Sequence, residues 1–372
     1  MRKYDIIVYG ASGFTAGYVI EELLAHNSNF ALAGRNKANI LKNIQDIPKA
    51  QNLEIMEYDP DNAEKFTSQA RIVINMAGPY IFSGEKIIQA CLNTQTHYLD
   101  ITGETFFIEN VIKNYSKSAS EKNVCIVNCC GFDSVPADLG VEYLKNVLQS
   151  NCKIQSVMKL NNSILNYTTY QSLICGIKNV NQTRKLRNKK EGKKLKKYFY
   201  NPQTNSYNVI FMGTDPSVVK RTQCANKKNN KSVADYYAYF DVGSWLNLQL
   251  FKFFFMILLL FSKFEFTCNL LLKYPSFFTF GKIKKDRPCK QALKNASFEL
   301  KFWGESEREK KILTIYGPDP GYKTTAICIV SCANSLLQSE NVKGGVLTPG
   351  ECFYEKGLCE ILKSNGLKFL IE

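Results

Sequence analysis

A glycine-rich segment near the start of the chain has the residue spacing of a phosphate-binding turn. Gly10 and Gly13 follow the apolar run Tyr4–Tyr9 and precede an amphipathic stretch that continues through Leu24. A strand, a tight turn and a helix in this order place backbone N–H groups and the positive end of the helix dipole against a pyrophosphate. The spacing is G-x-x-G-x-x-A, so Ala16 supplies a small side chain where the helix packs on the strand. The segment predicts dinucleotide binding; the alternative is an ordinary strand–helix turn.

The residues after the second predicted strand indicate which dinucleotide binds. Phe30–Ala33 is followed by Gly34, Arg35, Asn36 and Lys37, with no acidic residue among them. An NAD site usually has an acid at this position, where it binds the 2′-hydroxyl of the ribose. The planar guanidinium of Arg35 suits a 2′-phosphate instead, and Lys37 adds positive charge. We therefore expect NADP(H) in preference to NAD(H); the alternative is a solvated arginine at a strand end.

These residues need a scaffold that brings strand ends together, and the first part of the chain has the pattern of one. Short apolar runs alternate with amphipathic stretches, which is typical of a parallel sheet covered by helices on both faces. After Ser150 the alternation of strands and helices stops, and predicted strands such as Ile154–Leu160 are not separated by predicted helices. We expect an α/β fold with a dinucleotide-binding domain at 1–148, a second α+β domain at 149–320 and a C-terminal segment, 321–372, that packs back on the first domain. The predicted strands of the first domain are Tyr4–Tyr9, Phe30–Ala33, Leu53–Tyr58, Arg71–Met76, His97–Ile101 and Val124–Asn128.

The composition of the chain of 372 residues excludes several classes of protein. Lys and Arg number 48 against 33 Asp and Glu, and the net charge of +15 favours anionic partners such as phosphorylated ligands, anionic lipids or nucleic acid. A mean hydropathy of -0.21 excludes a polytopic membrane protein. There are 2 histidines, His26 and His97, so a histidine-rich metal site is excluded and no metal is expected. The 13 cysteines are scattered, odd in number and without a C-x-x-C pair, which indicates buried thiols in a reducing compartment.

An apolar stretch in the second domain, 245–281, predicts contact with a lipid surface. Phe253–Phe261 is uninterrupted by polar residues, but a membrane-spanning helix needs about twenty such residues. The two apolar pieces Leu246–Phe261 and Phe264–Leu272 suggest a helical hairpin in one leaflet instead. Basic residues that suit anionic headgroups follow it and extend the contact to 245–287: Lys282, Lys284, Lys285 and Arg287. The alternatives are a buried helix and a dimer interface.

A second basic patch is predicted on a helix over Ser172–Lys197, whose part at 184–197 is strongly basic. Only Glu191 offsets the positive charges between Arg184 and Lys197. The alternative is a solvated helix. No recognisable nucleic-acid-binding module accompanies the charge, so a nucleic-acid partner is not expected.

Several longer motifs resemble one family of oxidoreductases. The most distinctive in combination are Y-L-D-I-T-G-E at Tyr98–Glu104 and C-G-F-D-S-V-P-A-D-L-G at Cys130–Gly140. These motifs resemble those of the saccharopine dehydrogenase-like oxidoreductases, which are related to bacterial trans-acting enoyl reductases. The resemblance covers most of the chain and is weakest over 150–235. It implies a Rossmann domain, a mixed second domain, a nicotinamide cofactor and a link with lipid metabolism and membrane or lipid-droplet surfaces. Further matching segments are Tyr9–Thr15, Ala33–Asn36, Asn75–Tyr80, Gly317–Tyr322 and Gly344–Gly350.

With this resemblance, roles follow for residues at the strand ends. The carboxyl edge beyond the fourth to sixth strands is where the nicotinamide half of the cofactor lies in this fold. The cofactor-binding candidates are Gly10, Ser12, Gly13, Phe14, Thr15, Arg35, Lys37, Gly78 and Pro79. The candidates to polarise or protonate a substrate during hydride transfer are Tyr80, Asp133 and Ser134. The alternative for Asp133 and Ser134 is N-capping of the helix that starts near Pro136.

The sequence thus predicts an NADP(H)-dependent oxidoreductase that acts on a lipid-like substrate at a membrane or lipid-droplet surface, in lipid or glycolipid biosynthesis. One alternative is a non-enzymatic lipid-surface protein on a Rossmann scaffold, and another is a saccharopine-type amino-acid dehydrogenase. The expected location is the cytoplasmic side of membranes or lipid droplets. Secretion is not expected, because Asp5 follows the basic residues Arg2 and Lys3 and the apolar run after it, Ile6–Tyr9, is too short for a signal peptide. A homo-oligomer is compatible with the sequence, which does not determine the oligomeric state.

Overall fold

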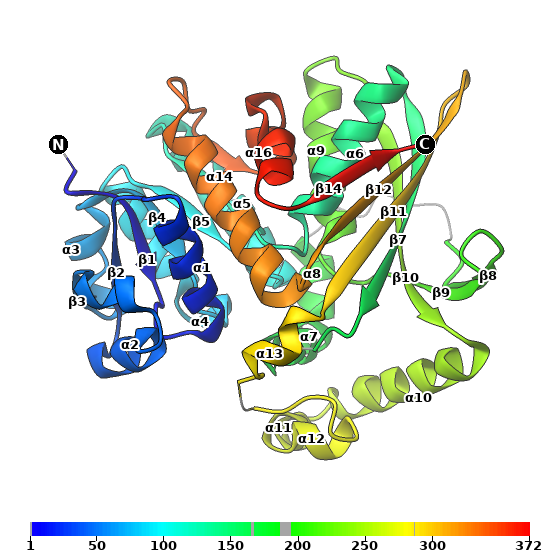
Figure 1. The fold of residues 1–372 in the computed structure, drawn as a ribbon, viewed down its shortest axis with the longest axis horizontal. Coiled ribbons are helices and arrows are strands. Elements are labelled where there is room, and N and C mark those ends of the chain that lie inside the picture. Colours follow the sequence, from blue (N-terminus) through cyan, green and yellow to red (C-terminus); the bar gives the residue numbers. More distant parts are fainter. Residues whose placement is uncertain (1, 165–166, 187–194, 286) are drawn as a thin grey trace. The chain divides into compact units, whose positions relative to one another are not determined.

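The computed structural model describes residues 2–164, 167–186, 195–285 and 287–372. The chain divides into two compact units, each with its own sheet (Figure 1). The first unit comprises Met1–Thr102, Phe107–Val135 and Tyr322–Gly366. The second unit comprises Gly103–Phe106, Pro136–Gly321 and Leu367–Glu372. The chain after Gly321 therefore contributes to both units.

The first unit is built on a fully parallel sheet. Within the described ranges its seven strands run in the order β13-β6-β5-β4-β1-β2-β3, and every neighbouring pair is parallel. The order reverses direction at β1, as in a doubly wound dinucleotide-binding fold. The predicted parallel sheet is therefore confirmed, and β13 is a further strand that the sequence pattern did not reveal. The strands are β1 (Tyr4–Tyr9), β2 (Phe30–Gly34), β3 (Ile55–Glu57), β4 (Ala70–Asn75), β5 (His97–Asp100), β6 (Cys125–Val127) and β13 (Gly345–Leu347).

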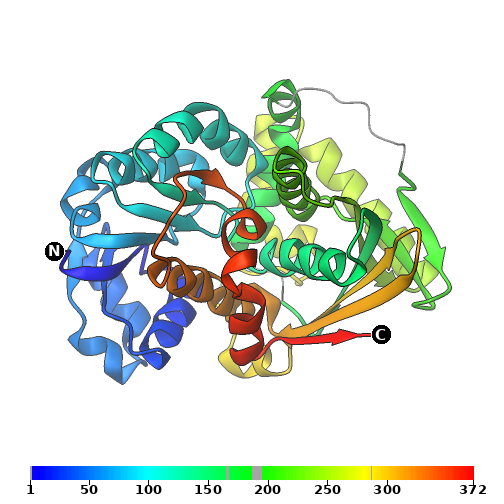
Figure 2. The ribbon, with the colours of Figure 1, turned by 90° about the horizontal axis from the view of Figure 1, so that it is seen from above.

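Helices cover both faces of this sheet because its strands are apolar on both sides. Ile6–Tyr9 of β1 is completely or almost completely buried, and the Tyr9 ring stacks on Phe66 with centroids 5.0 Å apart. α1 and α14 lie side by side on one face, and α3, α4 and α5 pack against the other (Figure 2). The helices are α1 (Phe14–Ala25), α2 (Lys37–Ile44), α3 (Glu64–Thr67), α4 (Tyr80–Asn93), α5 (Thr105–Glu121), α14 (Thr325–Leu337), α15 (Pro349–Phe353) and α16 (Leu358–Ser364).

The second unit is built on a mixed sheet, as predicted for an α+β domain. Its strand order among the described residues is β14-β12-β11-β7-β10-β9-β8, in which β7 and β10 are parallel and the other pairs are antiparallel. α6 approaches the sheet closely, since a Cβ atom at Gly140 would lie 2.5 Å from the Phe302 ring. The strands are β7 (Cys152–Asn161), β8 (Tyr198–Asn201), β9 (Ser206–Ile210), β10 (Ala234–Gly243), β11 (Ser297–Glu305), β12 (Lys310–Pro318) and β14 (Lys368–Ile371). The helices are α6 (Val135–Leu148), α7 (Tyr167–Lys178), α8 (Val180–Leu186), α9 (Asp215–Lys228), α10 (Trp245–Phe261), α11 (Glu265–Lys273), α12 (Pro275–Phe278) and α13 (Lys290–Lys294).

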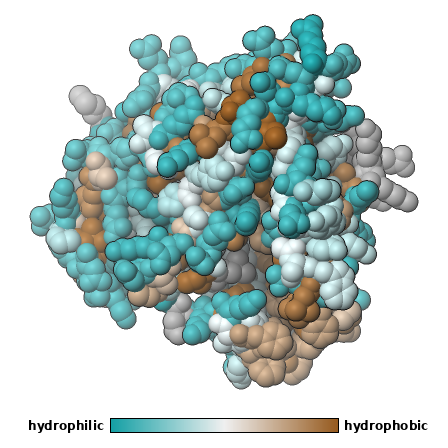
Figure 3. All heavy atoms as spheres, turned by 45° about the vertical axis from the view of Figure 1, so that its right-hand side comes forward, coloured by the Kyte–Doolittle hydropathy of each residue, from teal (hydrophilic) through white to brown (hydrophobic). Residues whose placement is uncertain are grey.

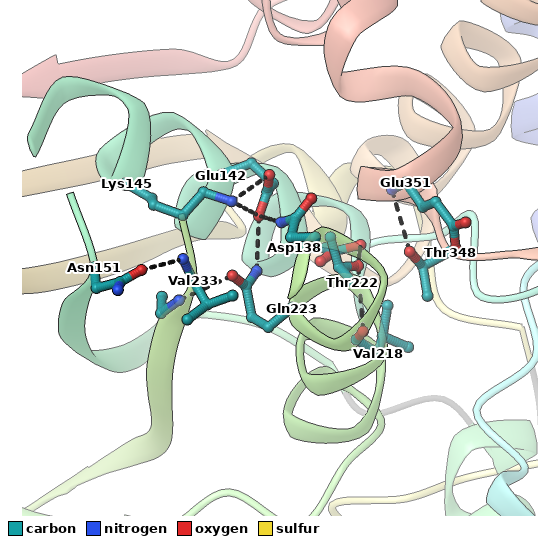
Figure 4. Close-up of polar contacts among 12 residues, drawn as sticks. Asp138, Glu142, Lys145, Asn151, Val218, Thr222, Gln223, Val233, Thr348 and Glu351 are labelled. Carbon is teal, nitrogen blue, oxygen red and sulfur yellow. Dashed lines mark hydrogen bonds and ion pairs between the residues drawn. The ribbon is translucent and has the colours of Figure 1, made fainter. Parts of the chain in front are cut away.

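A buried ion pair within α6 is hydrogen-bonded to side chains of α9 (Figure 4). Lys145 Nζ lies 2.8 Å from both carboxylate oxygens of Glu142, and both side chains are buried. Gln223 and Asn226 of α9 donate to Glu142 Oε1 at 2.7 and 2.9 Å. The carboxylate is thus compensated by one cation and two amides, which is the arrangement that a buried charge requires.

Two parts of the second unit differ from the sequence predictions. α9 and β10 were not predicted, because polar residues interrupt the apolar periodicity of both. The predicted helix over Ser172–Lys197 is wrong at its C-terminal end, because the described residues Leu195–Lys197 are not helical. Residues 187–194, which carry most of the predicted basic patch, lie outside the described residues.

Candidate functional site

The glycine turn between β1 and α1 is tightly folded against the loop that follows β4. Gly10 has φ +80°, and a Cβ atom there would lie 2.7 Å from the backbone nitrogen of Ala77. The Gly13 N–H donates to the Gly10 carbonyl at 3.0 Å, and Ala16 is completely buried where α1 meets the sheet. Only glycine fits this left-handed and crowded position without strain. The turn therefore has the shape in which a pyrophosphate approaches backbone atoms.

The N-terminus of α1 has no side-chain cap among the described residues. Gly13 occupies the N-cap position, and no acidic residue lies in the first turn of the helix. A Ser or Asp cap would use a backbone N–H and would place an oxygen where a phosphate oxygen has to lie. An uncapped helix N-terminus behind a glycine turn is therefore suited to an anionic ligand. Ser12 immediately precedes Gly13, and Phe14 and Thr15 are the first two residues of the helix.

Asn43 of α2 holds the turn from the side, and the sequence analysis missed it. Its Nδ2 donates to the carbonyls of Ala11 and Gly13, both at 2.8 Å. The two bonds direct these carbonyls toward α2. Nothing in the local sequence distinguishes Asn43 from other polar helix residues, so only the tertiary structure reveals this contact.

Arg35 and Lys37 lie where β2 ends, on the same edge of the sheet as the glycine turn. Both side chains are exposed, and Asn36 between them caps α2 by accepting the Asn39 N–H at 2.9 Å. Burial raises the pKa of Tyr9 to about 12, and the positive charge of Arg35 opposes part of that rise. Arg35 therefore lies within electrostatic reach of the end of β1.

Glu57 at the end of β3 is an acidic residue that the sequence analysis did not consider. Its Oε2 accepts the backbone N–H of Lys37 at 2.8 Å. The structure thus brings a carboxylate to the same corner as Arg35 and Lys37, although it lies on a different strand. Glu57 is the residue whose charge would compete with Arg35 in the choice between a 2′-hydroxyl and a 2′-phosphate.

The candidates near the nicotinamide position come from the ends of β4 and β6. The Gly78–Pro79 peptide is cis, and the buried Tyr80 donates its hydroxyl to the Asn75 carbonyl at 3.1 Å. Ser134 is buried, Asp133 is half-buried, and α6 begins immediately after them at Val135. In the strand order β6-β5-β4-β1, the end of β6 is separated from the end of β1 by three strand spacings, about 14 Å at roughly 4.8 Å per strand.

A buried hydrogen-bonded network lies between the candidates at the end of β4 and those at the end of β6. Asp100, at the end of β5, accepts the Tyr98 hydroxyl at 3.0 Å and the Asn128 amide at 2.7 Å. Tyr98 in turn accepts a hydrogen bond from Asn75 at 3.0 Å. The network therefore connects the ends of β4, β5 and β6, all within the first unit.

The outer face of α10 is apolar along its whole length. Its exposed positions recur with helical spacing, and the side chains are between 49% and 61% exposed: Leu246, Leu250, Phe253, Met256 and Leu260. The inner face packs through Leu258 against Tyr170 of α7 and Leu271 of α11. Figure 3 shows apolar residues gathered at the lower edge of the view, the part of the second unit to which α10–α12 belong in Figure 1. No helix within the described residues combines the length and apolar content needed to cross a bilayer.

The remaining reactive side chains form no further centre in the described part of the chain. No three His, Cys, Asp or Glu side chains there are placed to hold a metal ion. The cysteines are free and mostly buried, and Cys224 and Cys289 are the exposed ones. Burial raises the pKa of the Cys152 thiol to about 11 and that of Cys328 still further, which makes these thiols unreactive.

Comparisons with known proteins agree with this geometry. Residues 6–127 match the family model of the saccharopine dehydrogenase NADP binding domain. The chain is 32% identical over 418 residues to the human saccharopine dehydrogenase-like oxidoreductase, covering 100% of this chain and 97% of that protein. It is 30% identical over 431 residues to a Caenorhabditis elegans lipid droplet localized protein, covering 100% of this chain and 99% of that protein.

Two further similarities are more limited. A trans-acting enoyl reductase of Mycobacterium leprae is 37% identical over 150 residues, which cover 38% of this chain and 36% of that protein. The apo structure of saccharopine dehydrogenase from Saccharomyces cerevisiae superposes with a TM-score of 0.60 at 14% identity, and covers 99% of this chain and 100% of that chain. The similarity to the yeast enzyme concerns the fold.

Proposed function

Because the chain belongs to the saccharopine dehydrogenase-like oxidoreductase family, we propose that it binds NADP(H) and transfers hydride to or from a lipid-like substrate at a membrane or lipid-droplet surface. The observation that carries the cofactor assignment is the uncapped N-terminus of α1 behind Gly10 and Gly13. Arg35 and Lys37 at the end of the next strand support the choice of NADP(H) over NAD(H).

Titration of the protein with NADPH and with NADH by calorimetry tests this assignment. We expect NADPH to bind at least tenfold more tightly than NADH. Arg35→Ala should remove most of this difference, because a charge-assisted bidentate contact contributes about 1.5–3 kcal/mol. Glu57→Gln should improve NADPH binding, since it removes the competing carboxylate.

The matched control is Arg308→Ala, an exposed arginine in the second unit that should leave both affinities unchanged. Equal affinities of the unaltered protein for the two cofactors would contradict the proposed role of Arg35. Failure to bind either cofactor would contradict the proposed function itself.

Bound NADP(H) would supply or accept the hydride, and the chain would orient the substrate and hold the proton that accompanies it. We assign this proton to one of Tyr80, Asp133 and Ser134. The Tyr80 hydroxyl is engaged with the Asn75 carbonyl, so it has to exchange that bond for one to the substrate. Loss of a general acid lowers kcat by about 10²–10⁴-fold. Comparison of Tyr80→Phe, Asp133→Asn and Ser134→Ala, with cofactor affinity measured in parallel, should single out one of the three.

The apolar face of α10 supports a reaction at a lipid surface. Five half-exposed side chains buried in lipid would contribute roughly 5 kcal/mol. Within Trp245–Lys285 there are six lysines, which are Lys252, Lys263, Lys273, Lys282, Lys284 and Lys285, and one acid, Glu265. Each lysine near an anionic surface adds about 1 kcal/mol. The worm relative named for its lipid-droplet localisation agrees with this part of the proposal.

Flotation with vesicles measures the lipid contact directly. The intact protein should float with vesicles that contain phosphatidylserine, and less with neutral vesicles. The double variant Leu250→Glu, Phe253→Glu should stay at the bottom of the gradient. Leu41→Glu introduces the same charge at an exposed leucine of the first unit and should float normally. Flotation of the double variant would show that this face does not bind lipid.

Turnover assays separate the two alternative functions. A non-enzymatic lipid-surface protein would retain bound NADP(H) without turnover on any enoyl or carbonyl lipid. A saccharopine-type dehydrogenase would oxidise saccharopine with NADP⁺ or NAD⁺, which we do not expect.

A further inference from the structure

Asp100 is a fully buried carboxylate that ties together the loops after three neighbouring strands. Its Oδ1 accepts the backbone N–H groups of Thr102 at 3.0 Å and of Cys129 at 3.1 Å. Its backbone carbonyl accepts the Cys130 N–H at 2.7 Å. One residue at the end of β5 therefore fixes its own loop and the loop after β6.

The second carboxylate oxygen extends these contacts toward the glycine turn. Oδ2 accepts the Tyr98 hydroxyl and the Asn128 amide, and Tyr98 accepts a hydrogen bond from Asn75 on β4. Asn75 Oδ1 then accepts the backbone N–H of Ala77 at 3.0 Å. Ala77 is the residue that lies against Gly10. A continuous chain of contacts thus runs from Asp100 to the turn that we assign to the pyrophosphate.

The carboxylate has to be ionised to make all of these contacts. It accepts four hydrogen bonds, which matches the acceptor capacity of the charged form and exceeds that of an amide or an acid. One of its donors, Cys129, has φ +63°, a conformation that side chains other than glycine rarely adopt. The bond from the Cys129 N–H to Asp100 stabilises this conformation.

We propose that ionised Asp100 is a positioning residue that shapes the nicotinamide side of the cofactor pocket by holding the ends of β4, β5 and β6 in register with the glycine turn. This inference rests on the proposed binding of a nicotinamide dinucleotide. It assigns to Asp100 no contact with the cofactor. Its role is to orient the backbone that makes those contacts.

The surroundings of Asp100 make its charge dependent on pH near neutrality. Burial raises the pKa of Asp100 to about 6, although its four hydrogen bonds oppose the rise. The titratable groups that face it are Tyr98 on β5 and Cys130 after β6, with Tyr80 on α4 behind Tyr98. Burial holds the pKa values of Tyr98 and Cys130 well above their ordinary ranges, so both stay neutral between pH 5 and 8.

Cofactor titrations between pH 5 and 8 test the proposal, with NADH as the main probe. NADH lacks the 2′-phosphate, which itself titrates near pH 6 and would obscure the effect. For the unaltered protein we expect a constant Kd above pH 6.5 and up to a tenfold rise in Kd for each pH unit below 6. Asp100→Asn should bind at least tenfold more weakly at pH 8 and should show a flat profile. A variant with the same affinity and the same pH profile as the unaltered protein would overturn the proposal.

A second variant and the pH profile of the unaltered protein complete the test. Tyr98→Phe keeps the carboxylate but breaks the link to Asn75, so it should weaken NADH binding and retain the pH dependence. If Asp100→Asn does not fold, the unaltered protein decides the test alone: a Kd for NADH that stays constant between pH 5 and 8 would overturn the proposal. Absence of binding of either dinucleotide at every pH would instead refute the proposed function.

Discussion

Replacement of Gly10 by alanine should damage both the stability of the first unit and its binding of the dinucleotide. The left-handed backbone at φ +80° costs an alanine about 1–2 kcal/mol. The added methyl would lie 2.7 Å from the nitrogen and 2.9 Å from the Cα and Cβ of Ala77, and relief of such overpacking costs about 1–3 kcal/mol. The sum, about 2–5 kcal/mol, corresponds to a fall in Tm of roughly 5–15 °C for a unit of this size.

Gly17→Ala is the matched control for Gly10→Ala. Gly17 lies inside α1, and an added Cβ would meet its nearest neighbour, Asn43 Nδ2, at an ordinary 3.6 Å. An alanine in a helix interior is more stable than glycine by about 0.5–1 kcal/mol, so Tm should rise slightly and NADPH affinity should persist. Thermal unfolding and calorimetric titration of the two variants give the comparison. A Gly10→Ala variant with the Tm and the NADPH affinity of Gly17→Ala would refute the close approach of Ala77 to the turn.

Three other perturbations have defined outcomes. Lys145→Met leaves Glu142 buried without its cation and should lower the free energy of unfolding by about 3–5 kcal/mol in urea titrations, whereas Lys117→Met, at an exposed ion pair, should change it by less than about 1 kcal/mol. Asn43→Ala removes both bonds to the glycine turn and should weaken NADPH binding about tenfold in calorimetry, with little change in Tm. His97 has its pKa lowered by burial to about 4, so the unfolded chain takes up its proton first as the pH falls. The free energy of unfolding of the native protein, measured relative to His97→Gln, should therefore fall by about 3 kcal/mol between pH 7 and pH 4, and a constant difference would contradict the burial of His97.

The free energy of unfolding of the whole protein should fall less steeply with decreasing pH than the contribution of His97 alone implies. Asp100 has its pKa raised by burial to about 6, so the folded state binds its proton first and gains stability as the pH falls below that value. The two groups lie at opposite ends of β5 and contribute with opposite signs. For this reason the contribution of His97 has to be measured as the difference between the native protein and His97→Gln at each pH.

The local sequence predicted the first sheet because each β–α unit carries its own signals. The strands of the first unit are continuous apolar runs, and turns such as Gly10–Gly13 and Gly34–Arg35 separate them from amphipathic helices. Local periodicity is sufficient where neighbouring strands in the sheet are also neighbours in the chain. It failed for β13, since three residues near the C-terminus pair with β6 over a long separation in sequence.

In the second unit the apolar periodicity of the sequence is weaker, because strands and helices such as β10 and α9 bury only one face. β10 contains four tyrosines and phenylalanines among polar residues, and α9 has a polar sequence whose burial depends on the ion pair and amides around Glu142. A partner 81 residues away determines whether Gln223 is a surface or a core residue. The local pattern of a single sequence does not contain that information.

For the candidate site, the sequence by itself determined the residue types and the edge of the sheet on which they lie. Gly10, Gly13, Arg35 and Tyr80 follow strands that are parallel, and parallel strands bring their carboxyl ends to one edge whatever their order. Only the tertiary structure decided that Glu57 shares a corner with Lys37, that Asn43 holds the glycine turn and that Asp100 joins three strand ends. These contacts depend on side-chain directions and on distances of a few ångströms between residues that lie 20 to 32 positions apart in the chain. Spacing along the chain sets the periodicity of each element, whereas the packing of one element on another sets such distances.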